Sequence, residues 1–320
     1  MNSELYVTAH SELVQPHLAA WGWEIPVYLF LGGFTAGILV LSGWAALAGR
    51  GATRGERGLG LGSSGLFAVA LAAISIGMGA LFLDLEHKLH VWRLYTTFEP
   101  TSPMSWGAWI LLLVYPVLML GALASAPRAW LERVPVPALA RAADALAASP
   151  RALRAIAATS VAVGIALGIY TGILLSSLGA RPLWASGLLG PLFLVSGLSC
   201  TAAFSHWVSP RADEREAMAK LDNGFLAAEL AIVVLALIGL ASSSRAGAGA
   251  AALVLGGPFT AVFWVGVVGL GIVVPLFLQS LAVAHRIGHT PIAPLLVMGG
   301  GLVLRFVIVL AGQVSHWPVS

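Results

Sequence analysis

The chain has 320 residues, of which 58% are hydrophobic and only 10% are charged, and its mean hydropathy is +0.90. A soluble domain carries about 25% charged residues, so this composition excludes an ordinary soluble protein and indicates a membrane protein. The net charge of +3 comes from basic residues spread over the loops without a sustained basic stretch, so we expect no nucleic-acid partner.

The N-terminal segment shows no cleavable signal peptide. Its first 24 residues contain no Lys or Arg and no apolar core of the signal type. We therefore expect the first membrane span to act as its own insertion signal. Cys200 is the only cysteine, which excludes an intrachain disulfide and a cysteine-based iron–sulfur cluster or zinc site.

A membrane-spanning helix requires about 20 mostly apolar residues. The alternation typical of barrel strands is absent, and a backbone inside a bilayer must satisfy its own hydrogen bonds. We therefore predict an all-α polytopic membrane protein, a single domain over residues 1–320, with eight transmembrane helices in two four-helix bundles. The predicted spans are about 25–47, 61–83, 105–125, 153–177, 186–208, 223–242, 257–283 and 291–313.

The basic residues predict the orientation of the protein. The connections after spans one, three, five and seven hold twelve of the 17 Lys and Arg residues: Arg50, Arg54, Arg57, Arg128, Arg133, Arg141, Arg151, Arg154, Arg211, Arg215, Lys220 and Arg286. The opposite side holds Lys88, Arg93, Arg181 and Arg245, and Arg305 lies within the eighth span. The positive-inside rule then places both termini outside.

Two connections differ in character. The segment 126–152 is rich in Pro, Ala and Arg, and a surface helix is predicted at 137–148, with its proline at the first helical position. The outer loop 84–104 is instead dense in polar and aromatic groups, which is typical of functional loops. Spans six and seven are separated only by the small-residue run 242–253.

Glycine and alanine recur within the spans, as in Gly32, Gly33, Ala36 and Gly37, and again in Gly164, Gly168 and Gly172. Such spacing predicts close packing between membrane helices.

Polar residues of four successive spans are predicted to lie at a similar depth near the outer surface. The third span begins at this depth with Ser105 and Trp106. The candidate site residues are Trp23, Glu24 and Tyr28 in the first span, Asp84 and His87 after the second, and Tyr170 in the fourth. A quinone requires hydrogen-bond donors for its carbonyl oxygens, and quinol oxidation requires a carboxylate or imidazole to accept protons. We therefore interpret these residues as a quinone-binding site.

Several of these outer polar and aromatic residues also have purely structural interpretations. Trp23, Trp92 and Trp106 also fit an interfacial belt of aromatic residues. Asp84 and Glu86 also fit solvated charges at a helix end, and Tyr170 also fits a hydrogen bond between helices.

Two charges lie deeper in the membrane, and ionisable residues at such depth are candidates for function. Glu229 in the sixth span is expected roughly 10 Å, and Arg305 in the eighth span roughly 20 Å, from the inner surface. That difference argues against a direct ion pair. Asp222 and Glu229 share a helix face, and with His206 and Arg305 they outline an inner proton route; structural hydrogen bonds between helices are the alternative.

Haem binding between helices would require facing histidines inside the bundle. None of the eight histidines lies in the middle of a span: His10, His17, His87, His90, His206, His285, His289 and His316. We therefore expect no haem in this protein.

Three segments resemble the NrfD/PsrC family of integral membrane, quinone-reactive subunits. They are IPVYLFLGGFTAG at 25–37, LFLDLEHKLHVWRLYTTFEPTSPMSWGAWIL at 81–111, and GIYTGILLSSL at 168–178. The middle segment is the most specific, because an acidic residue, a Trp-Arg pair and Ser-Pro-Met-Ser-x-Gly follow one another in it. The resemblance extends over about residues 20–315 and is stronger in the first half.

The resemblance implies a subunit without metal that binds menaquinone or ubiquinone where a four-cluster, ferredoxin-like iron–sulfur subunit docks. That partner exchanges electrons with a catalytic subunit, often a molybdopterin enzyme. It also implies that Tyr170 is the quinone-site tyrosine, that residues 23–28 face the quinone, and that Asp84 and His87 form the polar edge beneath the partner. Lys88 and Arg93 would then be docking residues.

The sequence thus predicts a multi-pass subunit of the bacterial inner membrane that exchanges electrons and protons between a quinone pool and an extrinsic iron–sulfur subunit. Three alternatives remain at this point: a secondary transporter, a purely structural membrane anchor and a b-type cytochrome anchor. The absence of evident half-chain repeats disfavours the transporter, and the histidine positions disfavour the cytochrome.

Overall fold

The computed structural model describes residues 21–52, 54–55, 58–133, 135–178, 181–284, 288 and 290–315. These ranges form helices and no strand, and eight helical spans are long and apolar enough to cross a membrane. They are α1 (Glu24–Leu47), α2 (Ser64–Asp84), α4 (Pro103–Ser125), α7 (Pro150–Ser176), α8 (Leu189–Val208), α9 (Ala212–Ser243), the π-helix η2 (Val262–Val273) continued by α11 (Val274–Val283), and α12 (Ile292–Val314). The predicted all-α fold with eight spans is confirmed.

Shorter helices occupy the connections: η1 (Lys88–His90), α3 (Arg93–Thr96), α5 (Arg128–Leu131), α6 (Pro137–Ala148) and α10 (Arg245–Leu255). The surface helix predicted at 137–148 is confirmed as α6. Helix α10 is additional, because the sequence predicted only a separator there. Ser244 caps it by accepting a hydrogen bond from the Gly247 N–H at 3.0 Å, and its alanines favour helix.

Helix α9 begins at Ala212, well before the predicted start at residue 223. Its first turn carries Asp213 and Glu214, which suit the positive end of the helix dipole. Lys220 and Glu216 then form an ion pair one turn apart, with N–O distance 2.7 Å. Hydropathy identifies only the part of a helix that lies in lipid. The polar first turns of α9 were therefore not predicted.

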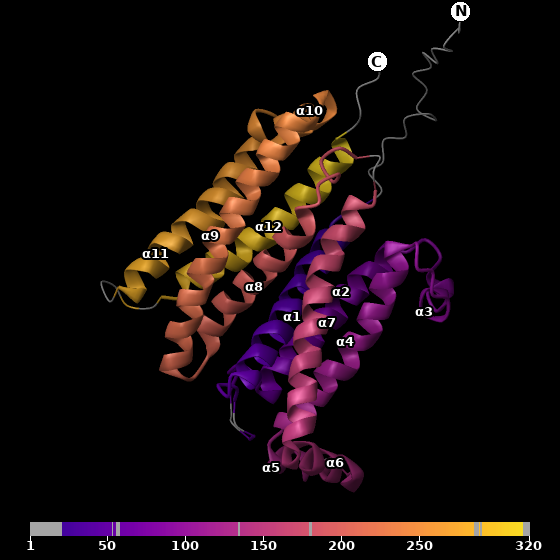
Figure 1. Ribbon diagram of the computed structural model, residues 1–320, viewed down its shortest axis with the longest axis vertical. Coiled ribbons are helices and arrows are strands. Elements are labelled where there is room, and N and C mark those ends of the chain that lie inside the picture. The colour runs from indigo at the N-terminus through magenta and orange to yellow at the C-terminus, as the bar shows by residue number, and fades with distance from the viewer. Residues whose placement is uncertain are drawn as a thin grey trace, which may run out of the picture.

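The helix contacts form two closed rings, and Figure 1 shows the two groups of helices side by side. In the first bundle, α1 contacts α2, α2 contacts α4, α4 contacts α7, and α7 contacts α1. In the second bundle, α8 contacts α9, α9 contacts α11, and α12 contacts both η2–α11 and α8. Contacts of α8 with α1 and α7, and of α12 with α1, join the two bundles.

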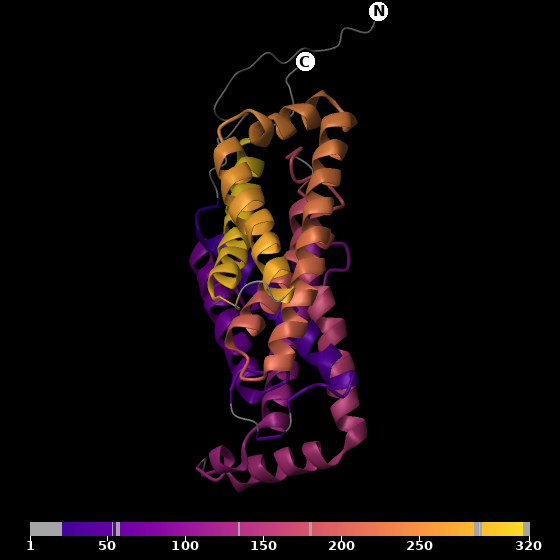
Figure 2. The same cartoon turned by 90° about the vertical axis from the view of Figure 1, so that its left-hand side faces the viewer.

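Short helices cover opposite ends of the molecule, with α10 across one end and α5 and α6 across the other (Figure 2). The Trp21 N–H donates to the Gln313 Oε1 at 2.9 Å, so the start of α1 and the end of α12 lie together. We call this the outer end and the end at α6 the inner end. Which side of the membrane each faces stays a prediction from the basic residues, of which Arg57 and Arg286 lie outside the described residues.

Close backbone contacts hold the two bundles together. A Cβ atom at Gly37 would overlap the Thr201 hydroxyl and the Gly197 carbonyl of α8, and one at Gly172 would overlap the backbone of Gly190. Helix packing through small residues is therefore confirmed at these positions. The prediction of close packing is wrong for Gly32, where an added Cβ would meet no neighbour within 4 Å.

The substitution Gly37→Ala is expected to lower stability by about 1–3 kcal/mol, because overpacking forces α1 away from α8. The matched control is Gly32→Ala on the same helix, which meets open space. Thermal unfolding of the purified variants in detergent measures both. Equal melting temperatures for the two variants would contradict the close α1–α8 contact.

Candidate functional site

Tyrosines from four elements meet towards the outer end of the first bundle. Tyr28 of α1 interacts electrostatically with Tyr170 of α7 and with Tyr95 of α3. Tyr95 also interacts with Tyr170 and with Tyr115 of α4. Of the five tyrosines in the sequence, only Tyr6 is missing from this group, and it lies outside the described residues. We call Tyr28, Tyr95, Tyr115 and Tyr170 the tyrosine cluster.

Glycines of neighbouring helices face the two most buried members of the cluster. A Cβ at Gly107 of α4 would overlap the ring and hydroxyl of Tyr170. Gly77 of α2 lies against Tyr28, whose Cα atom would be 3.6 Å from an added Cβ. Both tyrosine side chains are buried. Only glycine therefore fits opposite Tyr170, whereas Gly77 makes an ordinary close contact with Tyr28.

The cluster also reaches the lipid-facing side of the bundle. The hydroxyl groups of Ser75 in α2 and Tyr115 in α4 are 3.3 Å apart, at an exposed position. Apolar side chains on the same two helices are exposed around them, among them Ile76, Leu112 and Leu113. The cluster is therefore accessible at its Tyr115 edge, at the junction of α2 and α4.

Two carboxyl groups border the cluster at the outer end. Glu24 opens α1 and Asp84 closes α2, and the two interact electrostatically. Both are half-buried. The sequence had placed these residues and Tyr28 and Tyr170 at a common depth, and the structure brings all four to the same end of the same bundle.

Other predicted site residues lie on the outer surface. Trp23 is 53% exposed. His87 is exposed and precedes η1, with its ring centroid 6.1 Å from that of His90. Lys88 in η1 and Arg93 in α3 are exposed as well. These residues form the rim of the site and do not contribute to its interior.

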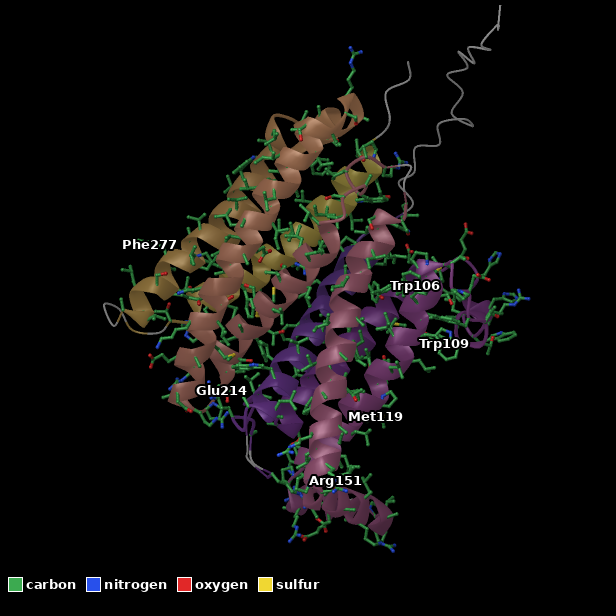
Figure 3. The ribbon with its side chains drawn as sticks, in the orientation of Figure 1. Trp106, Trp109, Met119, Arg151, Glu214 and Phe277 are labelled. Atoms are coloured by element: carbon green, nitrogen blue, oxygen red, sulfur yellow. The ribbon has the colours of Figure 1, made fainter. Side chains whose placement is uncertain are left out.

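The loop between α3 and α4 is held in place by the segment that opens α4. The Ser105 hydroxyl accepts from the Glu99 N–H at 3.0 Å, and the Trp106 indole N–H donates to the Pro100 carbonyl at 2.8 Å. Trp106, which also fits an interfacial belt, therefore fastens this loop. In Figure 3, Trp106 and Trp109 project from this end of α4, and Arg151 lies at the opposite end of the bundle.

Sequence reasoning missed Tyr95 and Tyr115. Tyr95 was noted only as part of the polar outer loop, and Tyr115 stands alone in an apolar span. Burial and the neighbouring Tyr115 raise the pKa of the Tyr95 phenol above its ordinary value, so Tyr95 stays protonated and able to donate a hydrogen bond. The sequence did offer one signal for them. Apart from Tyr6, every tyrosine falls in the part of the sequence that forms the first bundle.

A second polar cluster lies in the core of the second bundle. Arg305 of α12 is fully buried and donates to the Ser196 hydroxyl, to the Gly301 carbonyl at 3.0 Å and to the Phe193 carbonyl at 3.1 Å. Its guanidinium carbon also lies 5.0 Å from the centroid of the Phe193 ring. Ser196 also lies close to Glu229 of α9. A serine of α8 therefore links the buried cation to the buried carboxylate.

Asp222 of α9 lies closer to the inner end than Glu229 and is held by two hydrogen bonds. Its two carboxylate oxygens accept hydrogen bonds from the Ser199 hydroxyl of α8 and the Gln279 amide of α11, each at 2.6 Å. Asp222 and Gln279 are buried. Because Ser196, Ser199 and His206 are spaced three and seven residues apart, they share one face of α8. His206 is also buried, at the inner end of that helix.

Glu229 and Arg305 lie at similar distances from the inner ends of their helices. Measured from Ala212, where α9 begins, Glu229 lies about 25 Å along its helix; Arg305 lies about 20 Å along α12. The two residues therefore meet at Ser196. Among the described residues no direct ion pair joins them, as the sequence predicted.

The sequence also did not single out three polar residues of this cluster, Ser196, Ser199 and Gln279. They are uncharged, and isolated uncharged polar residues are common in membrane spans. No group of three or more His, Cys, Asp or Glu residues in the described part of the protein is arranged to hold a metal ion. Of the histidines weighed for haem, His10, His17, His285, His289 and His316 lie outside the described residues.

These features define a multi-pass helical membrane protein with one polar cluster in each bundle. The protein belongs to the family described as polysulphide reductase, NrfD, whose model matches residues 7–316. It is 29% identical over 317 residues to the C subunit of the polysulfide reductase of Wolinella succinogenes, covering 93% of this sequence and 96% of the relative. It is 30% identical over 313 residues to protein NrfD of Escherichia coli, covering 92% and 95%. Such homologues are membrane subunits of respiratory reductase complexes.

Proposed function

We propose that this protein is the quinone-reactive membrane subunit of a respiratory reductase complex of the bacterial inner membrane. The observation that carries the proposal is the tyrosine cluster, where four phenols converge beside two carboxyl groups. The quinone would be menaquinone or ubiquinone. It supplies the two-electron chemistry when bound, and the residues of this protein position it and exchange its protons.

The donor set fits a quinone headgroup. The carbonyl oxygens of a quinone accept hydrogen bonds, and protonated phenols donate them. Tyr170 and Tyr28 supply buried donors, and Tyr95 supplies a third that stays protonated. Asp84 and Glu24 supply carboxylates that accept protons and pass them to the outer surface. The junction of α2 and α4 is open to lipid at Ser75 and Tyr115 and suits entry of an isoprenoid tail.

The outer rim suits an extrinsic electron-transfer partner. We propose that a four-cluster, ferredoxin-like iron–sulfur subunit docks there and connects the quinone to a catalytic subunit of the molybdopterin type. The exposed cations Lys88 and Arg93 lie beside the exposed apolar side chains of Leu89, Trp92 and Phe98. Aromatic anchors among a few charges are typical of protein interfaces.

Purification from the native membrane in mild detergent tests this proposal. We expect a cysteine-rich iron–sulfur polypeptide to co-purify together with stoichiometric quinone in the lipid extract. A lone subunit without quinone that takes up solute after reconstitution would contradict it and support a secondary transporter. A Soret band in the isolated subunit would support a cytochrome instead.

We further propose that the buried cluster of the second bundle carries protons. Asp222, Glu229 and Arg305, linked through Ser196 and Ser199, continue towards His206 at the inner end. The Gln279 Oε1 and the Arg305 Nε are buried and have no hydrogen-bond partner in the described part of the protein. Buried polar atoms require partners, so water of a proton route would bind at these two atoms.

The substitution Glu229→Gln is expected to abolish charge movement across the membrane while turnover continues, because an amide does not exchange a proton. Charge movement is measured with a potential-sensitive dye on the whole complex in liposomes, together with quinol turnover. The matched control is Glu216→Gln on the same helix, where the carboxylate is paired with Lys220 at the surface. Unchanged charge movement in Glu229→Gln would exclude the route.

A further inference from the structure

A cavity of about 450 Å³ opens at the inner end of the first bundle, at the far end from the tyrosine cluster. It lies where α1 and α4 end and α2 and α7 begin, and Ala147 of α6 forms part of its wall. Its volume is within the range of small-molecule sites, about 300–1,000 Å³. Neither the quinone site nor the proton route uses this cavity.

The cavity is lined by both apolar and cationic side chains. Phe67 of α2 and Ile156 and Ala157 of α7 contribute apolar surface, whereas Arg54 and Arg154 contribute positive charge. Backbone at Gly49 and Gly62 also lines it, and both glycines have positive φ angles, 69° and 79°. Side chains are rarely tolerated in that conformation, so the loop presents bare backbone to the cavity.

The positive charge is only partly neutralised. The Arg54 Nη2 and the Arg128 Nε share one carboxylate oxygen of Asp144, at 2.6 and 3.5 Å. The Arg54 guanidinium beside it holds the pKa of the Asp144 carboxyl below its ordinary value, so this single carboxylate faces two cations. Arg154 adds a third cation, and the Arg54 Nε is buried without a hydrogen-bond partner in the described part of the protein.

The position of the cavity indicates which anion it meets. Helix α6 lies across this end (Figure 1), and the basic residues predict that this end faces the cytoplasm. The cytoplasmic leaflet is rich in anionic lipids, and basic pockets between membrane helices on that side bind phospholipid headgroups. A free phosphate would leave the apolar wall unused.

We propose that this cavity binds the phosphodiester headgroup of an anionic phospholipid from the inner leaflet. Arg54 and Arg154 contact the phosphate, and the first carbons of the acyl chains lie against Phe67 and Ile156. The bound lipid ties α6 to the ends of the four helices. This site is independent of quinone binding, so either proposal stands if the other fails.

The test uses the complex purified in mild detergent and mixed with equimolar phosphatidylglycerol and phosphatidylcholine. Lipid retained by the protein after gel filtration is then quantified. We expect selective retention of phosphatidylglycerol by the wild type, and about fivefold less in Arg154→Gln, the effect expected for one basic residue. Arg154→Lys is expected to retain most of the binding because it keeps the charge.

The matched control is Arg141→Gln, which removes an exposed arginine of α6 that does not line the cavity. It is expected to retain phosphatidylglycerol like the wild type. Equal retention of the two lipids by the wild type, or equal losses in Arg154→Gln and Arg141→Gln, would overturn the proposal. Displacement of the lipid by excess inorganic phosphate would identify a free-anion site instead.

Discussion

Replacing Arg305 by methionine is expected to lower the stability of the protein by about 3–5 kcal/mol, the effect of leaving a buried charge without its compensating opposite charge. The Arg305 side chain is fully buried and donates to Ser196 and to two backbone carbonyls. Methionine fills a similar volume but leaves those acceptors unpaired. It also leaves Glu229 in the core without a cation nearby.

The double variant Arg305→Met with Glu229→Gln separates these causes. Removing the uncompensated carboxylate is expected to restore part of the lost stability, because a buried neutral amide costs less than a buried charge. Thermal unfolding in detergent is the measurement, and Arg245→Met, at an exposed position on α10, is the matched control. An Arg305→Met variant as stable as the control would mean that the guanidinium is not held as described.

Replacing Tyr170 by phenylalanine is expected to lower quinol turnover by about ten- to hundredfold, because it removes one buried donor at the proposed headgroup site. The ring remains, so packing against Gly107 is preserved. Steady-state turnover of the whole complex with a quinol substrate measures the effect, and co-purification of the other subunits verifies assembly. His87→Ala is expected to have a smaller effect, since His87 lies on the exposed rim.

The substitution Gly107→Ala is expected to displace the Tyr170 phenol by steric overlap. Its Cβ would overlap the Tyr170 ring, so the hydroxyl must move although its chemistry is unchanged. We expect a comparable loss of turnover. Gly79→Ala on α2, where an added Cβ meets no neighbour within 4 Å, is the matched control. If Tyr170→Phe and Gly107→Ala both retain full turnover in assembled complex, the protein is a structural anchor.

Much of the fold was predictable because the bilayer limits the choices. Spans must be apolar and long, so hydropathy located all eight, and a proline at the first helical position helped to locate α6. Helix ends were less certain where polar turns continue a helix outside the lipid, as at the start of α9. Helix α10 was missed because a run of small residues is compatible with either a loop or a short helix.

The sequence by itself determined that this is a helical membrane protein and that Glu24, Tyr28, Asp84 and Tyr170 belong to one end, because span direction sets depth. It also singled out Asp222, Glu229 and Arg305, because charge is rare inside a membrane. Only the tertiary structure decided their partners. Helix rotation and packing angles, which depend on glycine contacts between distant segments, bring Tyr95 and Tyr115 to Tyr170 and place Ser196 between Glu229 and Arg305.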